Sequence, residues 1–293
     1  MYLKPLVGST SRIIGVRPVL TAALQAKQTA TASMMVRYAS NKTQSTQTMD
    51  IKYFGIPTDV YIPPSPKNVP PFYKNPKLAL KSIIRKAIML VKNTVFIAQF
   101  RLKSKISPRF VEWKNLALET YVDTNHAFAE RRLDLVRDRL SLWVYESLKS
   151  RLESVPKDVK LNWKLVKFNS TPKIVSVQPL LLPGKPMREI QIIYKIDTRQ
   201  RLARMSPHSK EPQVVEHDVV DYAAFTFDAS KIPARVYFAG TVFESSLEDS
   251  LPVASEKAEE MMQSMKIKGD IFRSPPKLNL SKKAELEQKQ ESK

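Results

Sequence analysis

The chain has 293 residues, of which 43% are hydrophobic and 9% aromatic, and this composition excludes a wholly disordered protein. It has no cysteine and only 3 histidines, which excludes disulfide scaffolds and cysteine nucleophiles and leaves little material for a metal centre. Lys and Arg outnumber Asp and Glu by 48 to 28, and the net charge of +20 predicts a polyanionic partner, either nucleic acid or a membrane rich in acidic lipid.

Residues 1–49 contain no Asp or Glu, but they carry scattered Lys and Arg among many Ser, Thr and Ala. This composition is typical of a mitochondrial targeting segment. Arg37 lies two residues before Ala39, so we expect cleavage between Tyr38 and Ala39 and removal of residues 1–38 as a presequence. The alternative is a disordered basic tail of a nuclear or cytosolic protein.

The next segment is rich in proline, with seven of the 21 prolines in residues 57–76. Proline lacks a backbone N–H and favours an extended conformation. Residues 39–76 are therefore predicted to form a Pro-rich linker that acts as a semi-rigid spacer.

Residues 60–111 contain no acidic residue and eleven basic ones. Apolar residues recur at spacings of three and four after Pro76, which predicts a basic amphipathic helix over 77–106. Its most apolar window, 87–100, includes Lys92 and is shorter than the roughly 20 apolar residues of a membrane span. We expect the helix to bind acidic lipid or RNA through Lys77, Lys81, Arg85, Lys86, Lys92, Arg101, Lys103, Lys105 and Arg109. The alternative is a helix packed on the protein's own core with its basic side in solvent.

Helical spacing resumes at Ser107 and continues to residue 152, where we expect two helices with a break near 129–132. After Pro156 the period changes to two, and strands are predicted at 160–169, 173–181, 188–198, 214–227 and 235–244. Helices followed by strands indicate an α+β domain with helices on one face of a curved antiparallel sheet. We place this domain at 107–270, with a peripheral helix over 245–270 and a polar disordered tail at 271–293.

The order of these elements and the segment 120–153 resemble a cone-shaped, NTF-like domain. That domain is shared by the motor scaffold of the mitochondrial presequence translocase and a mitochondrial large-subunit ribosomal protein at the tunnel exit. The matching residues are Tyr121, Asn125, Ala127, Ala129, Glu130, Leu133, Leu142 to Tyr145, Leu148 and Lys149. With its targeting segment and basic run, the chain looks most like the fungal inner-membrane mitochondrial ribosome receptors of this family. Arg131 and Arg132 depart from the family, which often has a small or Gly-Asp turn there.

The resemblance implies a non-catalytic ribosome receptor, peripherally attached to the matrix face of the mitochondrial inner membrane. It would tether the tunnel exit of the large ribosomal subunit to the membrane for co-translational insertion. The implied partners are ribosomal RNA and exit-site proteins, anionic inner-membrane lipid, the inner-membrane insertase and nascent chains. One alternative is a constitutive large-subunit protein whose residues 60–109 thread along RNA. An import-motor scaffold is a second, although it would need an acidic groove for positive presequences.

No catalytic motif is evident, because the chain lacks a Walker loop, a dinucleotide glycine pattern and a zinc-protease motif. Cone-shaped sheets can host acid–base isomerases, but Tyr194, Asp197, Asp221 and Tyr222 have no complementary His or Arg motif. We therefore expect no enzyme activity, no cofactor and no metal. Binding of a small molecule in the cone would require a cavity that Trp163, Tyr194 and Phe227 do not fill.

Residues 199–210 are predicted to form a basic hairpin tip with no acidic residue. Guanidinium groups on an exposed loop suit bidentate phosphate contacts, so we expect ribosomal RNA to bind Arg199, Arg201, Arg204 and Lys210. The alternative is a solvated loop without function. The three tryptophans, Trp113, Trp143 and Trp163, each fall in an apolar period, and we expect them in the core rather than as platforms for bases.

Overall fold

The computed structural model describes residues 50–69, 71–181, 186–205, 212–247 and 257–275. The predicted presequence with its cleavage site at Tyr38 and Ala39, most of the predicted tail, and Lys210 lie outside these ranges.

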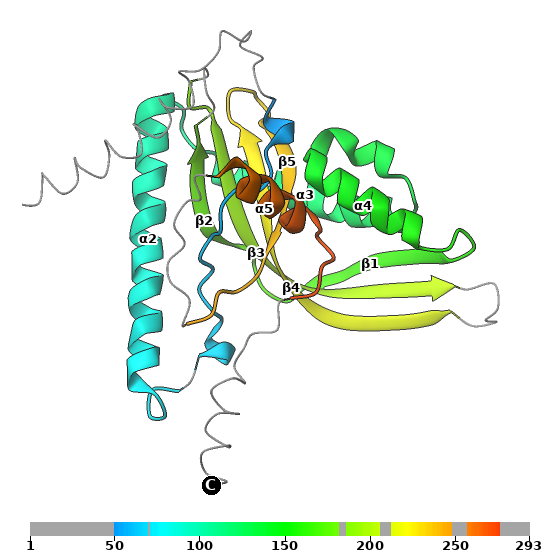
Figure 1. The fold of residues 1–293 in the computed structure, drawn as a ribbon, viewed down its shortest axis with the longest axis horizontal. Coiled ribbons are helices and arrows are strands. Elements are labelled where there is room, and N and C mark those ends of the chain that lie inside the picture. The colour runs from blue at the N-terminus through cyan, green and yellow to red at the C-terminus, as the bar shows by residue number, and fades with distance from the viewer. Residues whose placement is uncertain (1–49, 70, 182–185, 206–211, 248–256, 276–293) are drawn as a thin grey trace, which may run out of the picture. The chain divides into compact units, whose positions relative to one another are not determined.

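The centre of the fold is one open antiparallel sheet of five strands, β1 (Lys160–Phe168), β2 (Lys173–Leu180), β3 (Glu189–Met205), β4 (Gln213–Asp228) and β5 (Arg235–Val242). The order is β1-β3-β4-β5, and β2 pairs with the same side of β3 as β1 does. This is possible because β3 is long: residues 189–195 pair with β2, and residues 198–205 pair with β1. Figure 1 shows the second half of β3 extending with β1 and β4 as an arm.

All five predicted strands are present, and the α+β class is confirmed. The predicted end of the third strand is wrong, since β3 continues from residue 198 to Met205. Residues 199–205 are therefore paired strand and not a hairpin tip, because β1 and β4 both supply backbone partners for this stretch.

The helices are α2 (Pro76–Ser104), α3 (Phe110–Ala129), α4 (Leu142–Ser154) and α5 (Ala258–Gly269). α3 packs on β1 and β5, α4 and α5 pack on each other and on β5, and α2 packs on β2 (Figure 1). The predicted break near 129–132 is correct, because α3 ends at Ala129 and Arg131 has a left-handed φ of 59°. The next helix begins only at Leu142, where the Ser141 hydroxyl caps the backbone N–H of Val144, and Leu133–Arg139 form the 3-10 helix η3.

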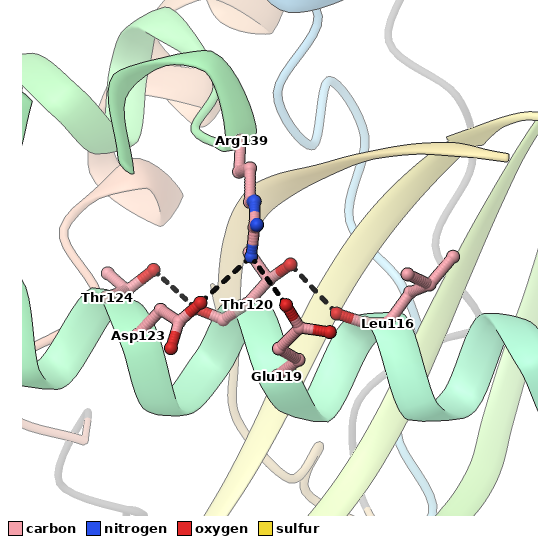
Figure 2. Close-up of polar contacts among 6 residues, drawn as sticks. All are labelled: Leu116, Glu119, Thr120, Asp123, Thr124 and Arg139. Atoms are coloured by element: carbon pink, nitrogen blue, oxygen red, sulfur yellow. Dashed lines mark hydrogen bonds and ion pairs between the residues drawn. The ribbon is translucent and has the colours of Figure 1, made fainter. Parts of the chain in front are cut away.

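An arginine joins η3 to α3. The Nη1 atom of Arg139 lies 3.0 Å from Glu119 Oε1 and 2.8 Å from Asp123 Oδ2, two carboxylates one turn apart on α3 (Figure 2). The Thr120 and Thr124 hydroxyls donate back to the carbonyls of Leu116 and Thr120. The charges of both signs in this region are therefore matched within the protein, which makes Arg139 a poor candidate for a phosphate contact.

Bulky aromatic side chains fill the layer between the helices and the sheet. Trp113 stacks on Phe227 with ring centroids 5.4 Å apart, and Phe225 stacks on Phe238 at 4.8 Å. A small-molecule cavity in the cone would need space that three bulky residues leave open. All three, Trp163, Tyr194 and Phe227, are instead buried. The core assignment of Trp113 and Trp163 is confirmed, whereas Trp143 is half-buried and its indole N–H donates to the Tyr53 carbonyl at 2.9 Å.

The other face of the sheet is covered by the segment that was predicted to be a spacer. Ile56 and Ile62 are fully buried and pack with Ile193 and Ala224, which alternate with the residues facing the helices. Ile62 donates its N–H to Ser245 Oγ and accepts from the Ser245 N–H. Residues 51–62 are thus part of the folded domain, because their apolar side chains supply the core on this face.

Candidate functional site

Two surfaces carry the residues predicted to bind polyanions, one on α2 and one on the arm. The rotation of α2 is set by Asn93, whose Nδ2 donates to the Val175 carbonyl at 2.9 Å while its Oδ1 accepts from the Val177 N–H at 3.0 Å. Both backbone groups belong to the outer edge of β2. Ser82, Met89 and other residues on the Asn93 side are consequently turned toward the sheet and buried.

Arg85 also lies on this inward side. The prediction that it binds lipid or RNA is therefore wrong, because its side chain is buried. It is 8% exposed, its Nη1 lies 3.4 Å from the Ser246 carbonyl oxygen, and its guanidinium lies 5.1 Å from the centroid of the Tyr61 ring. A guanidinium is tolerated in such a place when its donors are satisfied and its face stacks on an aromatic ring. Arg85 therefore holds α2 to the N-terminal segment.

The outward side of α2 is apolar. Leu80 is 52% exposed, Val91 64% and Leu102 80%, and the exposed set also includes Ile83, Ile84, Ile88, Leu90 and Val95. The periodicity that predicted an amphipathic helix is present, but the apolar side faces away from the protein's own core. α2 does pack on the protein's own core through its other side, where Phe100 is fully buried, so the alternative of a core-packed helix is correct about the packing but does not account for the exposed apolar side.

The other basic residues of α2 and the loop after it remain at the surface. Lys77, Lys92, Arg101, Lys103, Lys105 and Arg109 are exposed, and Lys81 and Lys86 are half-buried. Arg109 lies 3.4 Å from Glu112, and the Lys92 ammonium lies 5.5 Å from the centroid of the Phe96 ring. The apolar side of α2 is thus bordered by cations.

The arm carries the second basic surface. Lys164 pairs with Arg201 and Lys167 with Arg199 across β1 and β3, and paired residues point to the same face. Like charges directly opposite one another destabilise a sheet. On the β4 side of β3, the same face carries Asp218 opposite Arg199 and Glu216 opposite Arg201, and Glu216 lies 2.7 Å from Arg199. These carboxylates offset the two arginines in part, and the lysines of β1 leave a row of cations along the β1 side of the face that suits an extended anion such as a phosphate backbone.

Sequence reasoning found only half of this face. The lysines of β1, Lys160, Lys164 and Lys167, were missed, although their spacing along a predicted strand was a usable signal for the first two. A β-bulge between Leu165 and Lys167 brings the third to the same face. Arg204 pairs with Leu161 and lies on the opposite face from Arg199 and Arg201, so the structure does not bring the predicted arginines together.

A buried polar chain anchors the arm to α3. The Trp163 indole N–H donates to Gln200 Oε1 at 2.9 Å, Gln200 Nε2 donates to the Tyr121 hydroxyl at 2.8 Å, and that hydroxyl donates to Asp221 Oδ2 at 2.5 Å. Burial raises the pKa of Asp221. Burial, followed by the charge of Asp221, also raises the pKa of Tyr121.

The four residues considered for acid–base chemistry are each hydrogen-bonded within the protein or buried in its core. Asp221 is bonded to Tyr121, and the Tyr222 hydroxyl donates to Glu244 at 2.5 Å. Asp197 accepts from the Asn169 amide at 3.0 Å, and Tyr194 is in the core. Within the described ranges, no three His, Asp or Glu side chains gather as a metal site. In the same part of the chain, no helix combines the length and the hydropathy of a membrane span.

Two comparisons with known proteins match most of the chain. A family model described as MBA1-like protein matches residues 40–277. The inner membrane mitoribosome receptor MBA1, mitochondrial, of Saccharomyces cerevisiae is 38% identical over 231 residues, which are 78% of this chain and 82% of that protein.

Proposed function

The chain belongs to the MBA1-like protein family, and from this premise we propose that it is a non-catalytic mitochondrial ribosome receptor at the inner membrane. The yeast relative is named as such a receptor, and this name favours the receptor over a constitutive ribosomal subunit. The proposal places the protein peripherally on the matrix side, with the cone-shaped domain of the resemblance at the tunnel exit of the large subunit.

The observation that carries this proposal is the separation of two cationic surfaces along one strand. α2 packs on β2, which pairs with residues 189–195 of β3, whereas the basic face of the arm is built on residues 198–205. A strand rises about 3.3 Å per residue, so the centres of these two pairings are roughly 30 Å apart. One polyanion can therefore be bound at each end without competition, as a tether requires.

The arm is the ribosomal RNA side of this proposal. Arg199 and Arg201 offer bidentate phosphate contacts, and Lys164 and Lys167 add point charges beside them. Contacts of this kind position a protein on a nucleic-acid backbone without reading its sequence. Exit-site proteins would complete the interface.

α2 is the membrane side. Anionic lipid attracts each nearby Lys or Arg by about 1 kcal/mol, so the exposed cations of α2 suffice together for attachment even though none is decisive alone. Held in this way, the tunnel exit would release nascent chains close to the inner-membrane insertase.

Sedimentation of detergent-solubilised mitochondria at low and high potassium chloride tests the receptor role. Phosphate contacts predict a log–log slope of about 0.7 to 0.9 per contact, so the protein should travel with a large-subunit marker only at low salt. Membranes stripped of ribosomes should retain it. Co-migration with the particle at high salt would identify a constitutive subunit, and absence from the particle at all salt concentrations would disprove the receptor.

A further inference from the structure

The outward side of α2 carries one continuous apolar stripe. It follows the spacing of a single helix side over the whole element and consists of Leu80, Ile84, Ala87, Val91, Val95, Ala98 and Leu102, all exposed. Soluble proteins rarely expose a contiguous apolar patch of this kind, and such patches mark protein or membrane interfaces. We refer to these seven residues as the α2 stripe.

The α2 stripe cannot turn inward without breaking the fold. Asn93 is bonded to the backbone of β2 at 2.9 and 3.0 Å, and Arg85 is buried against Tyr61. Phe100, on the same inward side, is fully buried and contacts Trp113 edge to face, with ring centroids 6.5 Å apart. Three separate anchors along the helix therefore keep the stripe outside.

The charges beside the stripe decide which partner covers it. Lys77, Lys81 and Lys92 lie along one flank and Arg101 along the other, and residues 60–111 contain no acidic residue. A second copy of this helix would bring cations against cations, which is unfavourable at such a seam. A bilayer with anionic headgroups accepts the apolar stripe in its acyl boundary and the lysines in its phosphate layer. Exposed Phe72 and Tyr73, just before the helix, are suited to the same interfacial depth.

We propose that α2 is an in-plane membrane anchor whose apolar stripe enters the boundary between headgroups and acyl chains, with the flanking lysines on anionic headgroups. This inference rests on the proposed inner-membrane receptor and adds insertion to its electrostatic attachment. At about 1.5 Å per residue, the 29 residues of α2 span roughly 44 Å along the membrane plane. The arm, on the other half of β3, is left available for the ribosome.

The absence of cysteine from the sequence allows a site-specific test. Single variants of the full chain, Ile84→Cys and Val91→Cys on the stripe and Lys164→Cys on the arm, would be labelled with the environment-sensitive fluorophore NBD. Vesicles of phosphatidylcholine with cardiolipin should raise the fluorescence and shift it to shorter wavelength for both stripe labels, but not for the arm label. Phosphatidylcholine alone should give a smaller change.

Two results would overturn the anchor. Vesicles that bind the protein without changing either stripe label would show attachment by charge alone. A stripe signal that develops without vesicles and grows with protein concentration would show that a second copy covers the stripe.

A pair of aspartate variants separates this inference from the receptor role. Ile84→Asp combined with Val91→Asp should reduce flotation with the cardiolipin vesicles about tenfold or more, because a carboxylate must then enter the interface. The matched control is Val215→Asp, at a valine that is 54% exposed on β4. Both proteins should still sediment with ribosomes at low salt. Undiminished flotation of the double variant would disprove the anchor, whereas loss of ribosome binding by all three proteins, wild type included, would instead disprove the receptor.

Discussion

The side chain of Asn93 serves as a hydrogen-bonding neighbour for Val177 at the edge of the sheet. Its Oδ1 accepts from the Val177 N–H at 3.0 Å, and its Nδ2 donates to the carbonyl of Val175 at 2.9 Å. An exposed edge strand is a template for pairing with another chain, and proteins protect such edges. One amide thus covers part of the β2 edge and sets the rotation that turns the α2 stripe outward.

Replacement of this amide should loosen α2. In Asn93→Ala, the Val177 N–H and the Val175 carbonyl lose their partner, which should lower the free energy of unfolding by about 1–3 kcal/mol. Amide hydrogen exchange at Val177 should accelerate. Thr94→Ala is the control, because the Thr94 hydroxyl bonds within α2, to the Leu90 carbonyl. Equal exchange at Val177 in the two variants would refute this role of Asn93.

The like-charged pair Lys164 and Arg201 on the arm should lower the stability of the protein and strengthen its binding to the ribosome. Lys164→Glu places a carboxylate opposite Arg201, and an opposite-charge cross-strand pair should raise the free energy of unfolding by about 0.2–1 kcal/mol. The same change should weaken ribosome sedimentation and lower its salt dependence by about one contact. Arg204→Glu, on the other face, serves as the comparison and should weaken sedimentation less. Equal losses would show that the basic face of the arm is not the binding surface.

Asp221 should make stability depend on pH in a defined direction. Because burial raises its pKa in the folded state, the folded protein retains this proton at pH values where the unfolded chain, with a pKa of about 3.9, has lost it. The contribution of protonated Asp221 to the free energy of unfolding is therefore complete below the pKa of the unfolded chain, and it is lost as the pH rises through the pKa of the folded protein. Asp221→Asn removes this dependence and keeps an acceptor for Tyr121.

Urea denaturation over a pH series measures this effect. The stability of Asp221→Asn relative to wild type should rise from pH 4 upward, and it should become constant once the folded pKa is passed. A constant difference between wild type and Asp221→Asn at every pH would contradict the raised pKa.

Two buried tyrosines should respond oppositely to loss of the hydroxyl. The Tyr194 hydroxyl is buried with no hydrogen-bond partner in the described part of the protein, so Tyr194→Phe should leave stability unchanged or slightly raised. Tyr121→Phe deprives both Asp221 and Gln200 of a partner and should cost about 1.5–3 kcal/mol. Thermal unfolding of both variants compares them directly. A larger loss for Tyr194→Phe would mean that its hydroxyl has a partner.

Local patterns in the sequence were sufficient for most secondary structure. Alternation located the five strands, and spacing of three and four located α2 and α3, because these periods follow from backbone geometry alone. The end of α3 was located because one uninterrupted helix from Ser107 to residue 152 would be unusually long for a compact domain. The 3-10 helix η3 was missed, since its leucines continue the spacing of an α-helix. The ion pairs of Arg139 with Glu119 and Asp123 on α3 hold this segment in a different conformation.

The sequence by itself determined the fold class, the resemblance to the receptor family and the concentration of cations before residue 111. Only the tertiary structure decided which side of α2 faces outward, that Arg85 is buried, that Arg204 is separated from Arg201, and that residues 51–62 belong to the core. Periodicity shows that a helix has two unlike sides, but contacts with segments distant in sequence decide which side is covered. For α2 those contacts are the edge of β2 and the ring of Tyr61, and they leave the apolar side exposed.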